Sequence, residues 1–148
     1  MRFVFDARTA VPHFPGIGRY VAALARALPP LLEPGEEVAS IGPKTEISNF
    51  KLQTPNSKSD SSFIIHRSSF PSVFSLRQQW TIPATLRRMR ADVYHSPYYL
   101  MPYRPGLPTV LTVYDLIPLL YPQHTSFRAR LLFRLALWLA LRAAGRVI

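Results

Sequence analysis

Cysteine is absent from the 148 residues, which excludes disulfide bonds and thiolate-bound metal sites. Acidic residues are few, since eight Asp and Glu stand against 18 Lys and Arg, giving a formal net charge of +10. A chain with this charge attracts phosphate groups, which nucleic acids, anionic membranes and phosphorylated small molecules all carry. The composition therefore indicates an anionic partner and leaves its class open.

Long hydrophobic runs are also missing. The N-terminal apolar run is short and ends at Asp6, so it lacks the apolar region of a secretory signal. The longest apolar stretch, 131–144, is interrupted by Arg134 and Arg142 and falls short of the roughly 20 residues that span a bilayer. We therefore expect a cytoplasmic protein with no transmembrane helix.

Short strand-like and helical segments alternate along the chain. Hydrophobic residues make up 48% of it, and 15 prolines punctuate it. The expected strands cover residues 2–6, 38–42, 63–67, 92–96 and 109–115, with another beginning at 146–148. The expected helices run from 19 to 28, from 75 to 90 with a bend or restart at Pro83, and from 126 to 144.

This order predicts one α/β domain over 1–148, with a parallel sheet covered by helices on both faces. Residues 43–62 carry few large apolar side chains and cannot bury enough surface to offset ordering entropy. We expect a mobile loop there.

Ionisable side chains stand at the ends of three expected strands. Asp6 ends the first strand, His95 lies near the end of the fourth, and Asp115 ends the fifth. Ligands of open parallel sheets bind at the carboxyl ends of the strands, so these side chains are expected together on one edge. For each aspartate alone, capping a turn or the next helix is an equally good interpretation.

Two glycines stand just ahead of the first expected helix. Gly16 and Gly18 flank Ile17, where free backbone N–H groups and the helix dipole favour an anion, and Arg19 adds a positive charge. A tight turn without a ligand is the alternative. Val21 stands where a dinucleotide fingerprint needs its third glycine, so NAD or FAD binding is not predicted. The phosphate-binding GK[ST] signature of nucleotide triphosphatases is also missing.

Other catalytic patterns are weak or absent. The histidines at 13, 66, 95 and 124 lack the spacing of paired metal ligands, so no metal site is predicted. The sequence contains no GxSxG segment of a serine hydrolase. A glycosidase carboxylate pair formed by Asp6 and Asp115 is kept as a minor alternative.

The arginines of 128–146 allow two interpretations. The apolar helix packs on the sheet while its arginines extend to the rim, or these basic rims face anionic phospholipid or a lipid-linked phosphate. Binding of nucleic acid is not expected, because the tyrosines at 94, 98, 99 and 103 cluster in one loop region instead of alternating along a strand.

Four segments together resemble the N-terminal domain of family 4 glycosyltransferases, which are retaining enzymes of the two-domain GT-B architecture. The segments are FPGIGRYVAALARAL, SLRQQWTIPATLRRMRADVYHSPYYLMP, PTVLTVYDLIPLLYPQ and a basic helix ending in AAGRVI. The likeness covers nearly the whole chain apart from 43–62. It implies a Rossmann-like sheet that forms the acceptor-side half of a GT-B fold. A nucleotide-sugar half is absent from these residues, so the chain alone is expected to be inactive.

The resemblance also implies site residues. The Gly16-Ile17-Gly18 turn would approach the donor diphosphate and sugar, with Arg19 beside it. Tyr114-Asp115 matches the motif usually written His-Asp, which lies by the reacting sugar and acceptor. The tyrosine departs from that motif, although its hydroxyl can still donate or accept a hydrogen bond. The implied strand-end segment also includes His95, Ser96 and Tyr98.

The implied chemistry is front-face displacement, in which the leaving diphosphate helps to take the acceptor proton. It requires no metal or other cofactor of this domain. The implied ligands are a nucleotide sugar and a glycan or lipid-linked acceptor, and the implied partner is a C-terminal domain or second chain. Peripheral contact with the inner membrane surface is compatible with this function. The alternative function is a non-catalytic basic module that binds an anionic membrane surface or a polyanion.

Overall fold

The protein has an α/β fold built on a parallel sheet. The computed structural model describes residues 1–42, 63–67 and 70–148, so the loop expected over 43–62 lies outside the described residues. Every recorded pair of neighbouring strands is parallel. The strands follow the spatial order β3 (Phe63–Arg67), β2 (Glu37–Gly42), β1 (Arg2–Asp6), β4 (Val93–Ser96), β5 (Thr109–Leu111) and β6 (Arg146–Val147). The predicted parallel sheet is confirmed.

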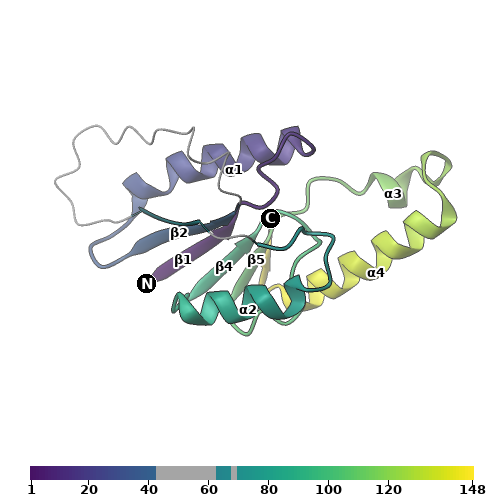
Figure 1. Cartoon of the computed structure of the whole chain (residues 1–148). Coiled ribbons are helices and arrows are strands. Elements are labelled where there is room, and N and C mark those ends of the chain that lie inside the picture. The colour runs from purple at the N-terminus through teal and green to yellow at the C-terminus, as the bar shows by residue number, and fades with distance from the viewer. Residues whose placement is uncertain (43–62, 68–69) are drawn as a thin grey trace.

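Helices cover both faces of this sheet (Figure 1). The four α-helices formed by described residues are α1 (Pro15–Ala27), α2 (Gln78–Arg88), α3 (Ile117–Leu120) and α4 (Phe127–Ala143). Short 3₁₀ turns occupy Pro29–Leu31 and Pro122–His124. In Figure 1, α1 lies on one side of the strands and α2 on the other, while α4 runs from the sheet out to α3.

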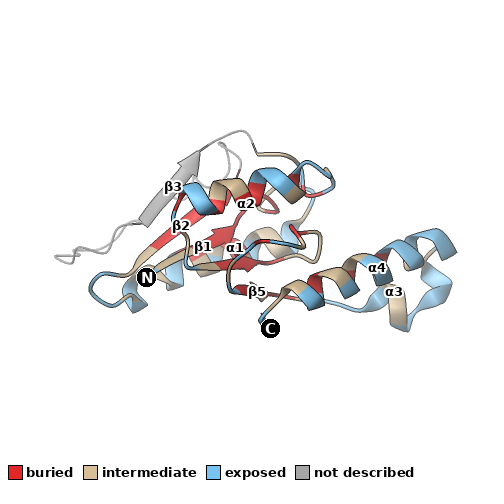
Figure 2. Cartoon of the chain, turned by 90° about the horizontal axis from the view of Figure 1, so that it is seen from below, coloured by how far each residue is buried: buried red, intermediate tan, exposed pale blue. Residues whose placement is uncertain are grey.

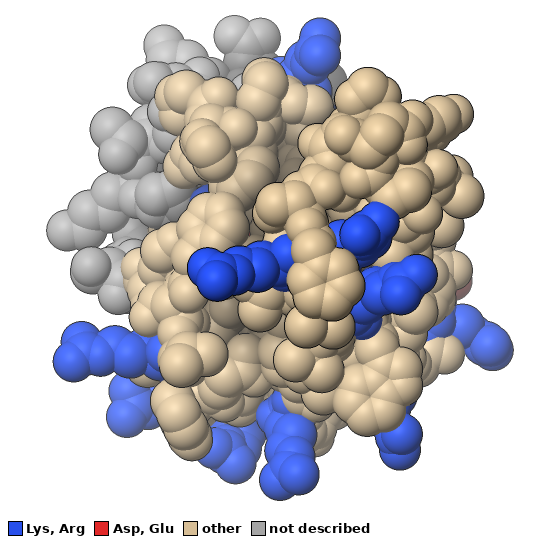
Figure 3. All heavy atoms as spheres, turned by 90° about the vertical axis from the view of Figure 1, so that its right-hand side faces the viewer, with Lys and Arg blue, Asp and Glu red and all other residues tan. Residues whose placement is uncertain are grey.

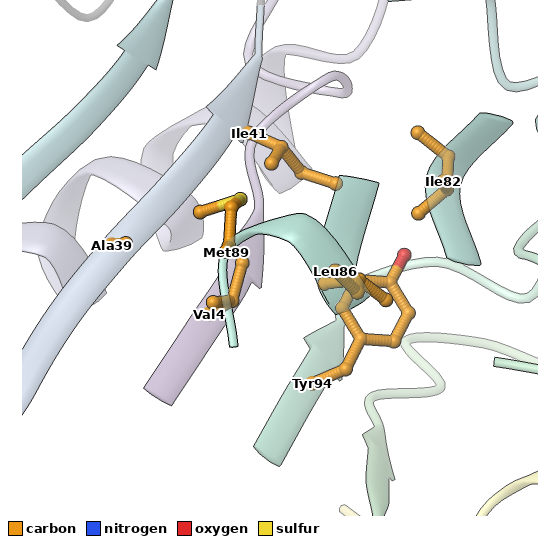
Figure 4. Packing of buried hydrophobic residues seen from close by; sticks show 7 residues of the cluster. All are labelled: Val4, Ala39, Ile41, Ile82, Leu86, Met89 and Tyr94. Carbon is orange, nitrogen blue, oxygen red and sulfur yellow. The ribbon is translucent and has the colours of Figure 1, made fainter. Parts of the chain in front are cut away.

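Alternation along the strands accounts for the two layers, because successive side chains point to opposite faces. Phe5 of β1 packs in one buried cluster with Val21 and Ala25 of α1. The neighbouring Val4 packs in another cluster with Tyr94 of β4 and with the α2-side residues Ile82, Leu86 and Met89 (Figure 4). Helices on both faces were predicted from the sequence, and these two clusters confirm them.

Ile82 gives a measure of how tightly the α2 face is packed. Its side chain is fully buried in the cluster of Figure 4. Ile82→Val removes one methylene, and the resulting cavity is expected to lower the free energy of unfolding by about 1 kcal/mol. Urea denaturation of both proteins measures the difference, and an unchanged midpoint would contradict this packing.

Several element boundaries differ from the sequence prediction. Helix α1 begins at Pro15 instead of Arg19, because proline at the first helical position loses no intrahelical hydrogen bond. Strand β5 ends at Leu111 instead of Asp115. The Thr112 N–H still donates to the Ser96 carbonyl, and no later ladder bond between these two segments is recorded among the described residues. Helix α2 covers Gln78–Arg88 instead of 75–90, and it passes through Pro83 as one helix without a restart.

Helix α4 was predicted to within one residue at each end. Ser126 caps its start, with Oγ accepting a hydrogen bond from the Ala129 N–H at 3.3 Å. The N-terminal half of α4 and α3 extend beyond the sheet in both ribbon views (Figures 1 and 2). Among the helices formed by described residues, none combines the length and the apolar character needed to cross a bilayer.

Candidate functional site

A cavity of 340 Å³ lies where the start of α1 meets the segment that follows β5. Five residues predicted for the site line it. Gly16 and Ile17 come from α1, Tyr98 from the loop after β4, and Tyr114 and Asp115 from the segment after β5. The fold therefore brings together the two predicted motifs that lie farthest apart in the sequence.

The glycine turn is the first turn of α1, and not a loop ahead of it as predicted. Pro15 has no N–H, and the Gly18 N–H donates to the Phe14 carbonyl at 2.8 Å. No acceptor within the described part of the chain is recorded for the N–H groups of Gly16 and Ile17, and no side chain caps the helix. These two donors at the positive end of the helix dipole suit an anionic oxygen in the cavity.

Gly18 and Arg19 line a different cavity from that of Gly16 and Ile17. They line a second cavity, of 450 Å³, together with Arg26. A Cβ placed on Gly18 would lie 3.5 Å from the Ala10 Cα, which is ordinary contact. The structure thus divides the predicted glycine motif, with Gly16 and Ile17 at one cavity and Gly18 and Arg19 at the other.

Asp115 lies beyond the end of β5 and is exposed to solvent. Its Oδ1 accepts a hydrogen bond from the Ile117 N–H at 3.2 Å, next to the start of α3. This is the capping role that the sequence allowed for an aspartate at a turn. The bond uses one carboxylate oxygen, and the residue also lines the 340 Å³ cavity, so the two interpretations are compatible.

Tyr114 stands edge-on to Tyr20, with the ring centroids 5.5 Å apart. Partial burial, and then the neighbouring Tyr20, raise the pKa of the Tyr114 hydroxyl above its ordinary value. The pKa of Tyr98 is raised chiefly by burial as well. Both phenols therefore keep their protons at neutral pH and can donate a hydrogen bond to a ligand oxygen.

His95 is buried and does not line the cavity. Its Nε2 lies 2.8 Å from the Thr112 Oγ1, and the Tyr20 hydroxyl lies 3.3 Å from the same oxygen. Burial lowers the pKa of His95 to about 4, against a smaller opposing effect of Asp6, so the imidazole is neutral at pH 7. His95 thus positions Thr112, which does line the cavity.

Ser96 also acts through a neighbour. It is buried, and its hydroxyl donates to the Tyr98 carbonyl at 2.7 Å. Sequence reasoning did not select Thr112 or Tyr20. Thr112 stands two residues before Tyr114, and the whole run from Thr112 to Asp115 lines the cavity.

Asp6 is separated from the cavity by strand geometry. His95 is in register with Phe5, so the adjacent Asp6 points to the opposite face of the sheet. Asp6, His95 and Asp115 do lie at or beyond the carboxyl ends of neighbouring parallel strands, as predicted, but Asp6 and His95 point to opposite faces of the sheet. Asp6 instead forms a buried ion pair with Arg8 at 2.7 Å and accepts a hydrogen bond from the Tyr94 hydroxyl at 2.6 Å.

The ion pair also connects the segment after β1 to the start of α2. Arg8 also donates to Gln78 Oε1 at 2.9 Å and to the Pro71 carbonyl at 3.1 Å. Burial opposes the charge on Arg8, but Asp6 more than compensates, and the pKa of the guanidinium is raised. With its carboxylate engaged in this way, Asp6 is not available as one half of a glycosidase pair.

No group of three or more His, Asp and Glu side chains among the described residues is arranged to hold a metal ion. Comparisons of the chain with protein-family models, with curated proteins and with solved structures found no match. The geometry of the 340 Å³ cavity is therefore the feature that bears on function.

Proposed function

We propose that the chain is the acceptor-side domain of a retaining glycosyltransferase, and that its Rossmann-like sheet is one half of a GT-B fold. The observation that supports this is the shared cavity, in which the first turn of α1 lies against the Tyr114-Asp115 segment. Backbone donors for a phosphate and polar groups for a sugar hydroxyl then stand on the walls of one site. Sugar transfer from a nucleotide donor needs both.

The two segments that line the cavity, the start of α1 and the Tyr114-Asp115 segment, have different roles in this reaction. The N–H groups of Gly16 and Ile17 bind oxygens of the donor diphosphate and stabilise the charge that develops there. The Tyr114 hydroxyl and the Asp115 carboxylate hold sugar hydroxyls. The ring of Phe14, whose centroid lies 5.3 Å from that of Tyr98, offers an apolar surface to a sugar face.

The transfer step requires no protein nucleophile. The acceptor oxygen bonds to the anomeric carbon while the bond from that carbon to the diphosphate oxygen breaks. The acceptor proton passes to the leaving diphosphate. The donor-binding half is part of this proposal and is supplied by a further domain or by a second chain. Cytoplasmic location of the enzyme is also part of it.

Gly16→Ala separates a role in binding from a role in folding. A Cβ at this position meets no atom within 4 Å, so the methyl group fits the folded chain and enters the cavity space. Alanine is also the better helix former by roughly 0.5–1 kcal/mol. We expect an unchanged or slightly raised thermal midpoint, together with transfer activity reduced by up to about 100-fold through a misplaced ligand.

The test has a binding arm and an activity arm. Amide NMR of the 148-residue chain titrated with UDP-glucose, GDP-mannose and methyl glycosides should shift the signals of Gly16, Ile17 and Asp115. Release of nucleoside diphosphate is then measured in the presence of the donor-binding domain or second chain that the proposal requires. Gly145→Ala is the matched control, because its Cβ meets only the Thr109 carbonyl, at 3.7 Å, away from the cavity. Wild-type activity in both Gly16→Ala and Asp115→Ala would overturn the proposed site.

A further inference from the structure

Helix α4 carries two apolar faces, and only one of them is covered. Phe133, Leu137 and Ala140 form the buried face. The outer α4 face is defined by Phe127, Leu131, Leu135 and Trp138, whose spacing of four, four and three residues places them on one side of a helix. Their exposed fractions are 71%, 56%, 52% and 51%. Figure 2 shows exposed residues along the length of this helix, with a few buried residues between them.

The apolar surface continues from α4 toward the segment that precedes α2. A cavity of 480 Å³ is lined there by Leu132 and Leu135 of α4 and by Phe74 and Leu76. Phe74 and Leu76 are themselves well exposed. A connected apolar area of this kind, left open on a folded chain, is typical of a surface that contacts a partner or a membrane.

The charge of this region has a single sign. Residues 116–148 contain five arginines and no acidic residue. Among the described residues, none of these arginines takes part in a recorded salt bridge. The guanidinium carbon of Arg142 lies 4.8 Å from the ring centroid of Trp138, so positive charge sits directly on the apolar face. Figure 3 shows basic side chains spread among uncharged surface at the end of the molecule that carries α3 and α4.

The combination of exposed apolar side chains and arginines favours one kind of partner for the outer α4 face. A second copy would bring the same arginines against one another. A polyanion such as RNA would pair with the arginines but leave Phe127, Leu131 and Leu135 in water. An anionic bilayer matches both the apolar side chains and the arginines. The apolar side chains enter the boundary between headgroups and acyl chains, and the arginines bind lipid phosphates.

We propose that the outer α4 face docks the protein on an anionic bilayer surface, with α4 lying in the plane of the interface. Helix α4 has 17 residues and carries arginines among its apolar side chains, which suits a helix that lies on a membrane. The docking surface is built from different side chains than the 340 Å³ cavity and does not depend on the function proposed for that cavity.

Flotation of the 148-residue chain with vesicles tests the proposal. We expect recovery with vesicles that contain phosphatidylglycerol, no recovery with phosphatidylcholine alone, and a loss of binding as salt is raised. The double change Arg134→Gln and Arg142→Gln should weaken partitioning by about 25-fold, since each arginine near an anionic surface contributes about fivefold. The matched control removes equal charge from α2 by Arg87→Gln and Arg88→Gln, and should stay within about twofold of wild type because exposed charges far from the interface are screened.

A fluorescence measurement places the helix relative to the lipid. In a Trp80→Phe background, Trp138 is the remaining tryptophan, and brominated phosphatidylglycerol vesicles should quench it. Equal binding to neutral and anionic vesicles, equal loss in the α2 control, or unquenched Trp138 would overturn the proposal. So would a dimer in light scattering that Leu131→Ser dissociates, or tight RNA binding that excludes vesicles. Gly16→Ala should bind vesicles as wild type does, so failure at the cavity and failure at the membrane are distinguishable.

Discussion

Replacing Arg8 with methionine is expected to lower the free energy of unfolding by about 3–5 kcal/mol, the range found when one partner of a buried ion pair is removed. Asp6 and Arg8 are only 3% and 7% exposed, and they lie 2.7 Å apart. Without the guanidinium, the Asp6 carboxylate would be left buried with the Tyr94 hydroxyl as its remaining side-chain donor. Urea denaturation at pH 7 measures the loss.

A second variant identifies the cause of that loss. In the Arg8→Met background, Asp6→Asn removes the uncompensated charge while keeping an oxygen that accepts from Tyr94, so part of the stability should return. The hydrogen bonds from Arg8 to Gln78 and Pro71 stay broken in both variants, so recovery should be incomplete. A loss below about 1 kcal/mol in Arg8→Met, the range of exposed pairs, would contradict a buried ion pair.

The second large effect is a dependence of stability on pH. The pKa of His95 is about 4 in the folded chain, against 6.5 for an imidazole exposed to water. The unfolded chain therefore binds the proton first, and His95 destabilises the fold as pH falls from about 6.5 to about 4. The full difference amounts to about 3 kcal/mol, and this contribution is absent above about pH 7.

His95→Gln isolates this contribution from that of the carboxylates. The amide of glutamine does not titrate and can still hydrogen-bond to Thr112. We expect the difference in unfolding free energy between wild type and variant to change steadily between about pH 6.5 and 4, in favour of the variant at low pH. Parallel curves over that interval would contradict a buried, neutral His95.

Local sequence patterns are sufficient to predict the order of strands and helices along the chain. The apolar runs at 2–6 and 38–42 become β1 and β2. Helix α4 follows its predicted bounds because Ser126 supplies a cap in the adjacent residues. These outcomes depend on contacts within a few positions of the chain. The start of α1 was also a local matter, but a proline and two glycines were interpreted as a loop when they form a helical turn.

The candidate site could be predicted only in part. The shared cavity of Gly16, Ile17, Tyr98, Tyr114 and Asp115 agrees with the motifs selected from the sequence. The observed positions of site residues differ from the predicted ones where a side chain could point to either face of the sheet or to either side of a turn. Helix geometry directs Gly18 and Arg19 to a different cavity from that of Gly16.

The sequence by itself determined that this chain forms a parallel α/β sheet, because periodicity, turn residues and apolar content act locally. Tertiary structure alone decided the roles of the polar side chains. Register places Phe5 beside His95 and turns Asp6 to the opposite face, where Tyr94 and Gln78, remote in sequence, complete its ion pair with Arg8. A buried charge takes its function from what surrounds it, and those surroundings exist only after distant segments have packed.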